Sequence, residues 1–135
     1  MRTFVTRKQK DMKGYKARIN EILIQEKQYK DPEFSASKLA ERLGVSVFRL
    51  SRILKAEYGM TYTAIVHEQR MQDAMRHLKD PRYAPFTVDD IGTMVGFRNR
   101  QSFFEAFRRA TGTTPMQYRK RGQTGNATTS ELATP

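Results

Sequence analysis

The chain contains one pattern twice. The first copy, from residue 39, is LAERLGVSVFRLSRILKAEYGMT, and the second, from residue 91, is IGTMVGFRNRQSFFEAFRRATGTT. Gly44 aligns with Gly96, and Leu50 aligns with Phe103 after one extra residue in the turn. Each copy has a short helix, a glycine that permits left-handed backbone, an apolar turn residue and a second helix. The repeat therefore predicts two helix-turn-helix units about 52 residues apart.

Apolar residues at helical spacing and capping residues predict the other elements. A first helix carries Tyr15, Ile19, Ile22 and Leu23 and should end before Asp31-Pro32. The expected caps are Ser35 or Ser37, Ser46, Thr87 in a capping box with Asp90, Asn99, and Thr114 followed by proline. A longer helix beginning at Thr61 should bury Tyr62, Ile65, Val66, Ala74, Met75 and Leu78. Because no stretch alternates as a strand does, we predict an all-α protein of about seven helices.

These elements predict a division of the chain into five segments. Residues 1–14 form a basic flexible leader, and residues 122–135 form a tail that is too small and polar to bury a core and is expected to be disordered. Between them lie a first helix-turn-helix subdomain (15–60), a bridging helix (61–80) and a second helix-turn-helix subdomain (81–121).

The charge of the chain indicates a polyanionic partner. There are 25 lysines and arginines against 14 acidic residues, a formal net charge of +11. Such a protein is attracted to nucleic acid first and to an anionic membrane second. No apolar run approaches the roughly 20 residues of a membrane-spanning helix, and the chain has no cysteine, which fits a reducing compartment such as the cytoplasm.

Catalysis and metal binding are not expected. The two histidines, His67 and His77, both fall in the bridging helix but lack the four-residue spacing of a zinc-binding helix. Asp89 and Asp90 are better explained as acidic residues in the first turn of a helix, where they interact favourably with the helix dipole, than as a catalytic dyad. We therefore expect no enzyme activity, no cofactor and no metal site.

The second helix of each copy has an outward face suited to DNA. In the first copy Phe48, Arg52 and Lys55 lie opposite the apolar stripe, with Arg49 and Ser51 on the flanks. In the second copy the corresponding positions are Gln101, Glu105 and Arg108, with Arg100, Ser102 and Phe104 beside them. A helix is about 10–12 Å across and the major groove about 12 Å wide, so an exposed helix can reach base edges.

The residue types suit both bases and phosphates. Arginine pairs with guanine, glutamine with adenine, glutamate with cytosine, and an aromatic ring contacts the thymine methyl group. The predicted base contacts are Phe48, Arg49, Ser51, Arg52, Arg100, Gln101, Phe104 and Glu105. The predicted phosphate contacts are Lys55, Arg108, Arg109 and Arg119.

The sequence resembles the AraC/XylS family of bacterial transcription regulators over residues 35–120. The resemblance rests on LAERLGVSVFRLSRILKAEYGMT, RMQDAMRHL, DIGTMVGF and SFFEAFRRATGTTPMQYR. It implies a homeodomain-like fold of two helix-turn-helix subdomains joined by a long helix, which places two recognition helices in neighbouring major-groove segments of double-stranded DNA. Glu105 departs from the family, which often has a basic residue there, and Arg70 matches an arginine that we interpret as structural.

Two alternatives to sequence-specific regulation remain open. The chain could be an adaptor that docks on a protein such as RNA polymerase, or a non-specific nucleic-acid binder. Many family members carry a ligand-sensing domain ahead of this unit, and the roughly 34 residues present here are too few for one. We therefore expect no small-molecule effector site within this chain, which resembles either a stand-alone member or the C-terminal piece of a longer regulator.

Overall fold

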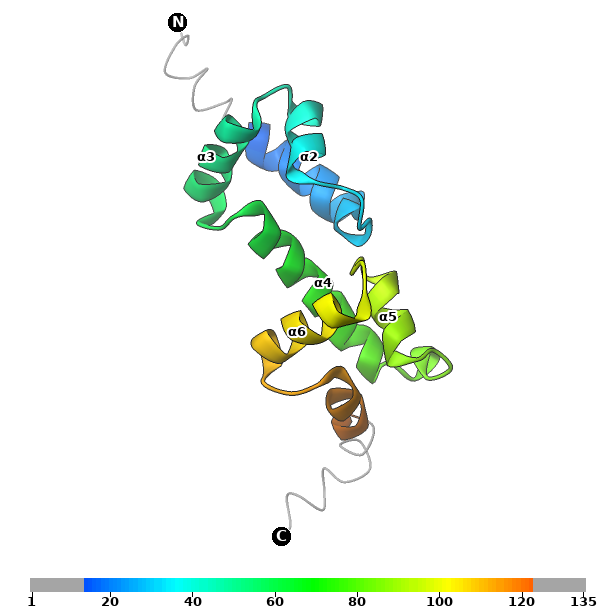
Figure 1. The fold of residues 1–135 in the computed structure, drawn as a ribbon. Coiled ribbons are helices and arrows are strands. Elements are labelled where there is room, and N and C mark those ends of the chain that lie inside the picture. Colours follow the sequence, from blue (N-terminus) through cyan, green and yellow to red (C-terminus); the bar gives the residue numbers. More distant parts are fainter. Residues whose placement is uncertain (1–13, 123–135) are drawn as a thin grey trace, which may run out of the picture. The chain divides into compact units, whose positions relative to one another are not determined.

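The computed structural model describes residues 14–122, and within them the protein is entirely helical. Seven α-helical segments, with short 3₁₀ and π turns and no strand, make up this part of the chain, which confirms the predicted fold class. The predicted leader and tail lie outside the described residues, except for Gly14 and Gly122, which are both helical. The chain divides into two compact units, one ending at Gln69 and one beginning at Arg70, and the division falls within helix α4, Tyr62–Lys79 (Figure 1).

The first unit begins with a helix that is less regular than the sequence predicts. Helical residues 14–20 continue into a π-helical turn, Glu21–Gln25, and a 3₁₀ turn follows at Gln28–Lys30. Between them Lys27 takes a left-handed conformation with φ of 60°. The first helix thus ends before Asp31, as predicted, but by way of a π turn and a separate 3₁₀ turn that the sequence did not indicate, and Tyr29 lies in the same core as the first helix.

The first helix-turn-helix follows its predicted caps. Helix α2, Ala36–Leu43, begins where the Ser35 hydroxyl accepts a hydrogen bond from the backbone N–H of Lys38, and it ends at Gly44. Helix α3, Val47–Tyr58, is capped in the same way by Ser46. Because φ at Gly44 is +74°, in the left-handed region, this turn favours glycine. The core of the unit is mainly aliphatic, with Tyr29 and Phe34 as its buried aromatic residues; the large aliphatic members are Ile19, Ile22, Leu23, Leu39, Leu50, Ile53, Leu54, Ile65 and Val66.

A bidentate ion pair links the end of the first helix to α2. Arg42 donates to both carboxylate oxygens of Glu26, at 2.7 and 3.1 Å. The Arg42 guanidinium lowers the pKa of the Glu26 carboxyl through these hydrogen bonds. The pair joins residues 16 positions apart and so stabilises tertiary rather than local structure.

The second unit repeats the motif with different cores and caps. After the 3₁₀ turn Pro81–Tyr83, helix α5, Val88–Met94, begins with the predicted capping box between Thr87 and Asp90. Helix α6, Arg100–Thr111, is capped by the Asn99 side chain and ends at Gly112. A last helical segment occupies residues 115–122.

Aromatic rings dominate the second core. Phe103 lies 5.3 Å from the ring of Phe97 and 5.8 Å from that of Phe107, centroid to centroid. The ring of Phe103 also lies directly against the backbone of α5 at Gly92, where a Cβ atom would come within 2.5 Å of it. Gly92 therefore sets how closely α5 and α6 approach each other.

Helix α4 buries most of the residues that its periodicity predicts, and two more. Ile65 and Val66 belong to the first core, and Ala74 and Leu78 to the second. Met71 and Asp73 are also buried, which the sequence did not indicate. The Asp73 carboxylate accepts a hydrogen bond from Arg76 one turn later, and this charged partner compensates for its burial.

Candidate nucleic-acid interface

Helix α3 turns a continuous polar and aromatic face to solvent. Its apolar stripe, Leu50, Ile53 and Leu54, is buried in the first core. All five outward residues predicted to contact DNA are exposed: Phe48, Arg49, Ser51, Arg52 and Lys55. The capped N-terminus and the glycine C-terminus fix the length of the helix, and the buried stripe fixes its rotation about its own axis.

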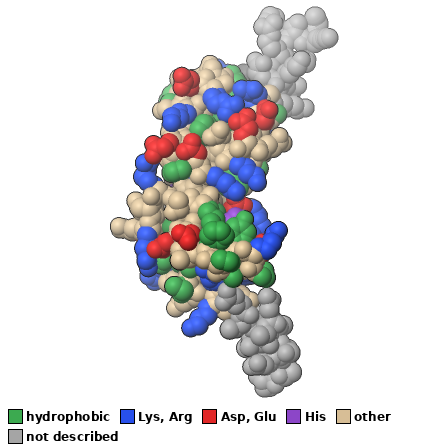
Figure 2. All heavy atoms as spheres, turned by 90° about the vertical axis from the view of Figure 1, so that its right-hand side faces the viewer, with side chains coloured by type: hydrophobic (Ala, Val, Ile, Leu, Met, Phe, Trp, Pro, Cys, Tyr) green, Lys and Arg blue, Asp and Glu red, His purple; other side chains and the backbone are tan. Residues whose placement is uncertain are grey.

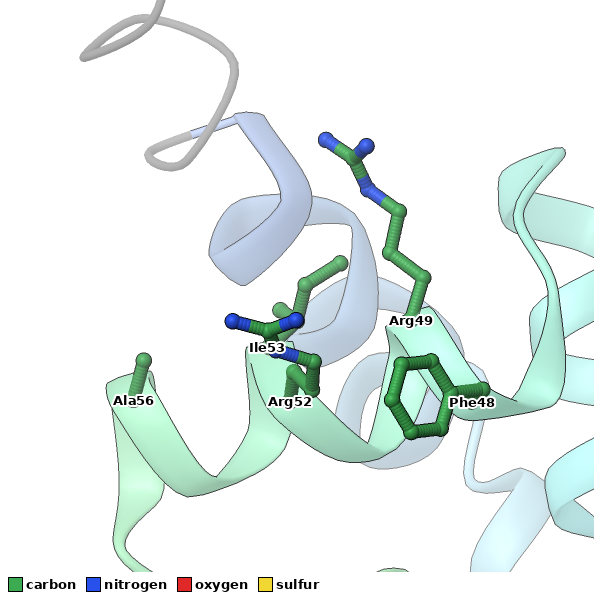
Figure 3. A pocket seen from close by; sticks show the side chains of 5 residues that line it. All are labelled: Phe48, Arg49, Arg52, Ile53 and Ala56. Atoms are coloured by element: carbon green, nitrogen blue, oxygen red, sulfur yellow. The ribbon is translucent and has the colours of Figure 1, made fainter.

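A depression of about 500 Å³ lies along this face and is lined by Phe48, Arg49, Arg52, Ile53 and Ala56 (Figure 3). The guanidinium of Arg52 lies over the phenyl ring of Phe48, with its central carbon 5.8 Å from the ring centroid. Arg49 points away from this pair, toward the first helix, and lies 5.7 Å from the ring of Tyr15 (Figure 3). Both arginines therefore contact rings, and neither forms a salt bridge with residues 14–122.

Helix α6 exposes the corresponding residues of the second copy. Arg100, Gln101, Glu105, Arg108 and Arg109 are all exposed, while Phe103, Ala106 and Phe107 form the buried stripe. Phe104 is an exception among the predicted base contacts. It is half-buried, packs against the second core and meets Phe103 edge to face at 5.9 Å. Only part of its ring is available to a ligand.

The outward groups of α6 are bonded to one another and to α5. Arg100 donates to the Asp89 carboxylate at 3.1 Å, and its guanidinium lies 4.5 Å from the ring centroid of Phe104. The Gln101 amide donates to Glu105 at 3.1 Å. This pairing leaves the Gln101 oxygen, its second amide hydrogen and the other Glu105 oxygen for further hydrogen bonds.

The four predicted phosphate contacts fall into two groups. Lys55, Arg108 and Arg109 are exposed on their helices. Arg119 is half-buried and donates to the backbone oxygen of Tyr83 at 2.6 Å, which ties the helix at 115–122 to the 3₁₀ turn. A guanidinium has five N–H donors, so this bond leaves Arg119 with others for a phosphate.

Two residues near the site were not among the predicted contacts. The sequence indicates Asp89 only as a helix-start carboxylate, and the structure shows that it also accepts a hydrogen bond from Arg100 of α6. The signal available in the sequence was an acidic residue eleven positions before a basic one, across a helix-turn-helix turn. Tyr15 of the first helix approaches Arg49, and no sequence pattern linked residues so far apart. Arg70 lies 5.5 Å from the ring of Phe97, in line with the structural role inferred for it.

Charge is distributed over both units. On the face shown in Figure 2, lysine and arginine side chains are spread over each unit, with acidic side chains among them. Net charge alone therefore does not outline an interface on that face, and the outward faces of α3 and α6 define the candidate site.

In residues 14–122 no three His, Asp or Glu side chains cluster as metal ligands would. None of the described helices combines the length and apolar character needed to cross a membrane.

Comparison with known proteins places this architecture in a family. A family model described as "Helix-turn-helix domain" matches residues 39–121, more than half of the chain. The xylose operon regulatory protein of Escherichia coli K12 is 28% identical over 82 residues. The chain belongs to the AraC/XylS family of transcription regulators. The aligned part is 61% of this chain and only 20% of that relative's length.

Two further AraC/XylS relatives are closer in length. The probable transcription factor PqrA of Proteus vulgaris is 26% identical over 106 residues, which are 77% of this chain and 84% of that protein. Among solved structures, the DNA-binding domain of the global transcriptional factor AdpA, in complex with a target DNA, is similar with a TM-score of 0.64 and 25% identity. The similarity covers 72% of this chain and 86% of AdpA's domain.

Proposed function

We propose that this AraC/XylS member regulates transcription by binding double-stranded DNA in a sequence-specific manner, with α3 and α6 in neighbouring major-groove segments. The observation that carries the proposal is that both second helices bury an apolar stripe and expose an outward face of base- and phosphate-binding residues. Each helix has the diameter to enter a major groove. The similarity to AdpA's DNA-bound domain supports the same conclusion.

In this proposal the outward residues divide by chemistry. Phe48, Arg49, Ser51 and Arg52 of α3 contact bases, and so do Arg100, Gln101, Phe104 and Glu105 of α6. Lys55, Arg108, Arg109 and Arg119 hold phosphates and fix the register of the helices on the duplex. The functional segments are then the subdomains at 15–60 and 81–121, with residues 61–80 as the helix between them. Acting on chromosomal DNA, the protein works in the bacterial cytoplasm.

The decisive experiment is selection of bound fragments from a random duplex library with the full 135-residue chain. We expect an enriched motif long enough to span two neighbouring major-groove segments, about 34 Å apart along the duplex. A motif that fits one segment would show that only one helix engages bases. Equal binding of the selected and a scrambled duplex at physiological salt would instead support a non-specific nucleic-acid binder.

Salt dependence gives a second test. Each phosphate neutralised by a lysine or arginine contributes a slope of about −0.9 to the fall of log K with log salt concentration. The variant Lys55→Ala removes one of the exposed cations of α3. It should reduce the slope by about that amount and weaken binding to all DNA sequences equally. Failure of every duplex to bind, or an affinity that does not change with salt concentration, would contradict the proposal and favour docking on a protein such as RNA polymerase.

A further inference from the structure

Phe48 is the most exposed of the large apolar side chains in the described part of the chain. The residue is 72% exposed, although it stands at the start of a helix whose other face is buried. A single exposed apolar residue needs no explanation by itself. Phe48, however, lines the depression on the outward face of α3 together with Arg52 (Figure 3), whose guanidinium carbon is 5.8 Å from the centroid of its ring.

The contact with Phe48 leaves the hydrogen-bonding edge of Arg52 available. A guanidinium is planar and carries five N–H donors, and an apolar ring beside it accepts no conventional hydrogen bond from them. Arg52 is exposed and forms no salt bridge with the described residues. The ring therefore lies close to the cation without occupying its N–H donors, which remain available for a bidentate contact.

These two side chains present one apolar group and one bidentate donor on the same face of a helix. In the major groove the matching pair of chemical groups is the C5-methyl of thymine and the O6 and N7 acceptors of guanine. Cytosine has no methyl group, and adenine offers only one acceptor beside an amino group that would face the guanidinium. Phosphate would satisfy Arg52 but would leave Phe48 without a partner.

The spacing limits how far apart the two bases lie. The central carbon of the guanidinium is 5.8 Å from the centroid of the ring, and successive base pairs rise about 3.4 Å. We propose that the Phe48–Arg52 pair recognises a thymine and a guanine no more than two base pairs apart in the preferred site. This inference rests on the proposed function and specifies the sequence that α3 selects.

The thymine half is tested by removing one methyl group from the DNA. Each thymine of the selected duplex is replaced in turn by deoxyuridine, and binding of the full chain is measured by fluorescence anisotropy. Burial of one methyl group corresponds to about a fourfold change in affinity, so one replacement close to a guanine should weaken binding by about that factor. The Phe48→Ala variant should bind more weakly and should not respond to this replacement.

The guanine half is tested with 7-deazaguanine, which lacks the N7 acceptor. Wild-type protein should lose affinity at one guanine within two base pairs of the sensitive thymine. Arg52→Ala should bind the unmodified site about 5- to 150-fold more weakly and should be insensitive to the modification. Val47→Ala is the matched control, because Val47 precedes Phe48 in α3 and is 48% exposed, and it should retain both responses.

The outcomes separate this inference from the proposed function. Sequence-specific binding in which no deoxyuridine replacement matters, or in which Phe48→Ala retains the full response, would overturn the thymine–guanine assignment and leave DNA regulation intact. A selected motif without a thymine and guanine within two base pairs would overturn it as well. Absence of any selected motif would overturn the proposed function itself. Circular dichroism of each variant verifies that it is folded.

Discussion

Helices α3 and α6 occupy the same place in the two copies of the motif but differ in how their outward groups are held. On α3 the two arginines lie near aromatic rings, are exposed and have no carboxylate partner among the described residues. On α6, Arg100 is paired with Asp89, and Gln101 with Glu105. Each helix begins at a side-chain cap, ends at a glycine and buries an apolar stripe, so the duplication preserves the scaffold while the two surfaces diverge.

The difference has an energetic consequence for DNA binding. When an arginine of α3 binds a base, it exchanges hydrogen bonds to water for hydrogen bonds to the base. Arg100 must give up or share a charged partner at the same time, and this loss offsets part of what a new contact contributes. We therefore expect α3 to supply more of the sequence discrimination than α6.

The largest expected effect concerns the shared scaffold. Phe103→Ala should lower the free energy of unfolding of the second unit by about 3–5 kcal/mol, because it removes a fully buried ring. Urea denaturation followed by circular dichroism measures this loss. Phe104→Ala is the matched control, since that ring is half-buried and should cost less. An equal or greater loss in the control would show that the buried stripe of α6 is assigned wrongly.

The comparison between the two surfaces is tested directly by a pair of arginine variants. Arg52→Ala should cost about 1–3 kcal/mol of discrimination at one base pair. Arg100→Ala should cost less, because its guanidinium already has a carboxylate partner. Competition between the selected duplex and single-base variants of it gives both values. If Arg100→Ala cost more, α6 would be the dominant reader and the comparison would be reversed.

A smaller effect is expected from Asp89→Asn, which removes the charge that holds Arg100. The pair is largely exposed, so stability should change by no more than about 1 kcal/mol. Binding to DNA should tighten, because Arg100 is released from its carboxylate partner. The gain should disappear in the double variant with Arg100→Ala. A gain that persists there would mean that Asp89 acts only by repelling phosphate.

The smallest effect concerns acid stability of the first unit. The pKa of Glu26 is lowered in the folded protein by Arg42, so the pair stabilises the fold at neutral pH and loses this contribution as pH falls through the folded-state pKa. The free energy of unfolding of Glu26→Gln should therefore fall less steeply than that of the wild type as the pH is lowered. Arg82 lowers the pKa of Asp80 too, but these residues are only two positions apart. Asp80→Asn should alter the acid response less, and thermal melts from neutral to acidic pH compare the two.

The sequence predicted those features that depend on local chemistry. Ser46, Asn99 and the Thr87–Asp90 box were identified because a cap needs only a side-chain oxygen beside a free N–H. The outward positions of α3 and α6 followed from helical periodicity in the same way. Both kinds of prediction use residues within a few positions of each other.

Features that depend on tertiary contact were not predicted. The left-handed Lys27 and the burial of Asp73 depend on neighbours that sequence spacing does not reveal. The bond from Arg119 to Tyr83, across 36 residues, changes how a predicted phosphate contact is used. The pairing of Arg100 with Asp89 belongs to the same class, and it is the contact that most distinguishes the two recognition surfaces.

The close approach at Gly92 constrains attempts to exchange DNA specificity between regulators. A methyl group at this position would collide with the Phe103 ring, so α5 and α6 are matched as a pair. A chimaera that received α6 alone, on a partner helix bearing alanine here, would tilt the transplanted helix or leave its phenyl group misplaced. Transfer of binding preference should therefore move residues 87–112 as one block.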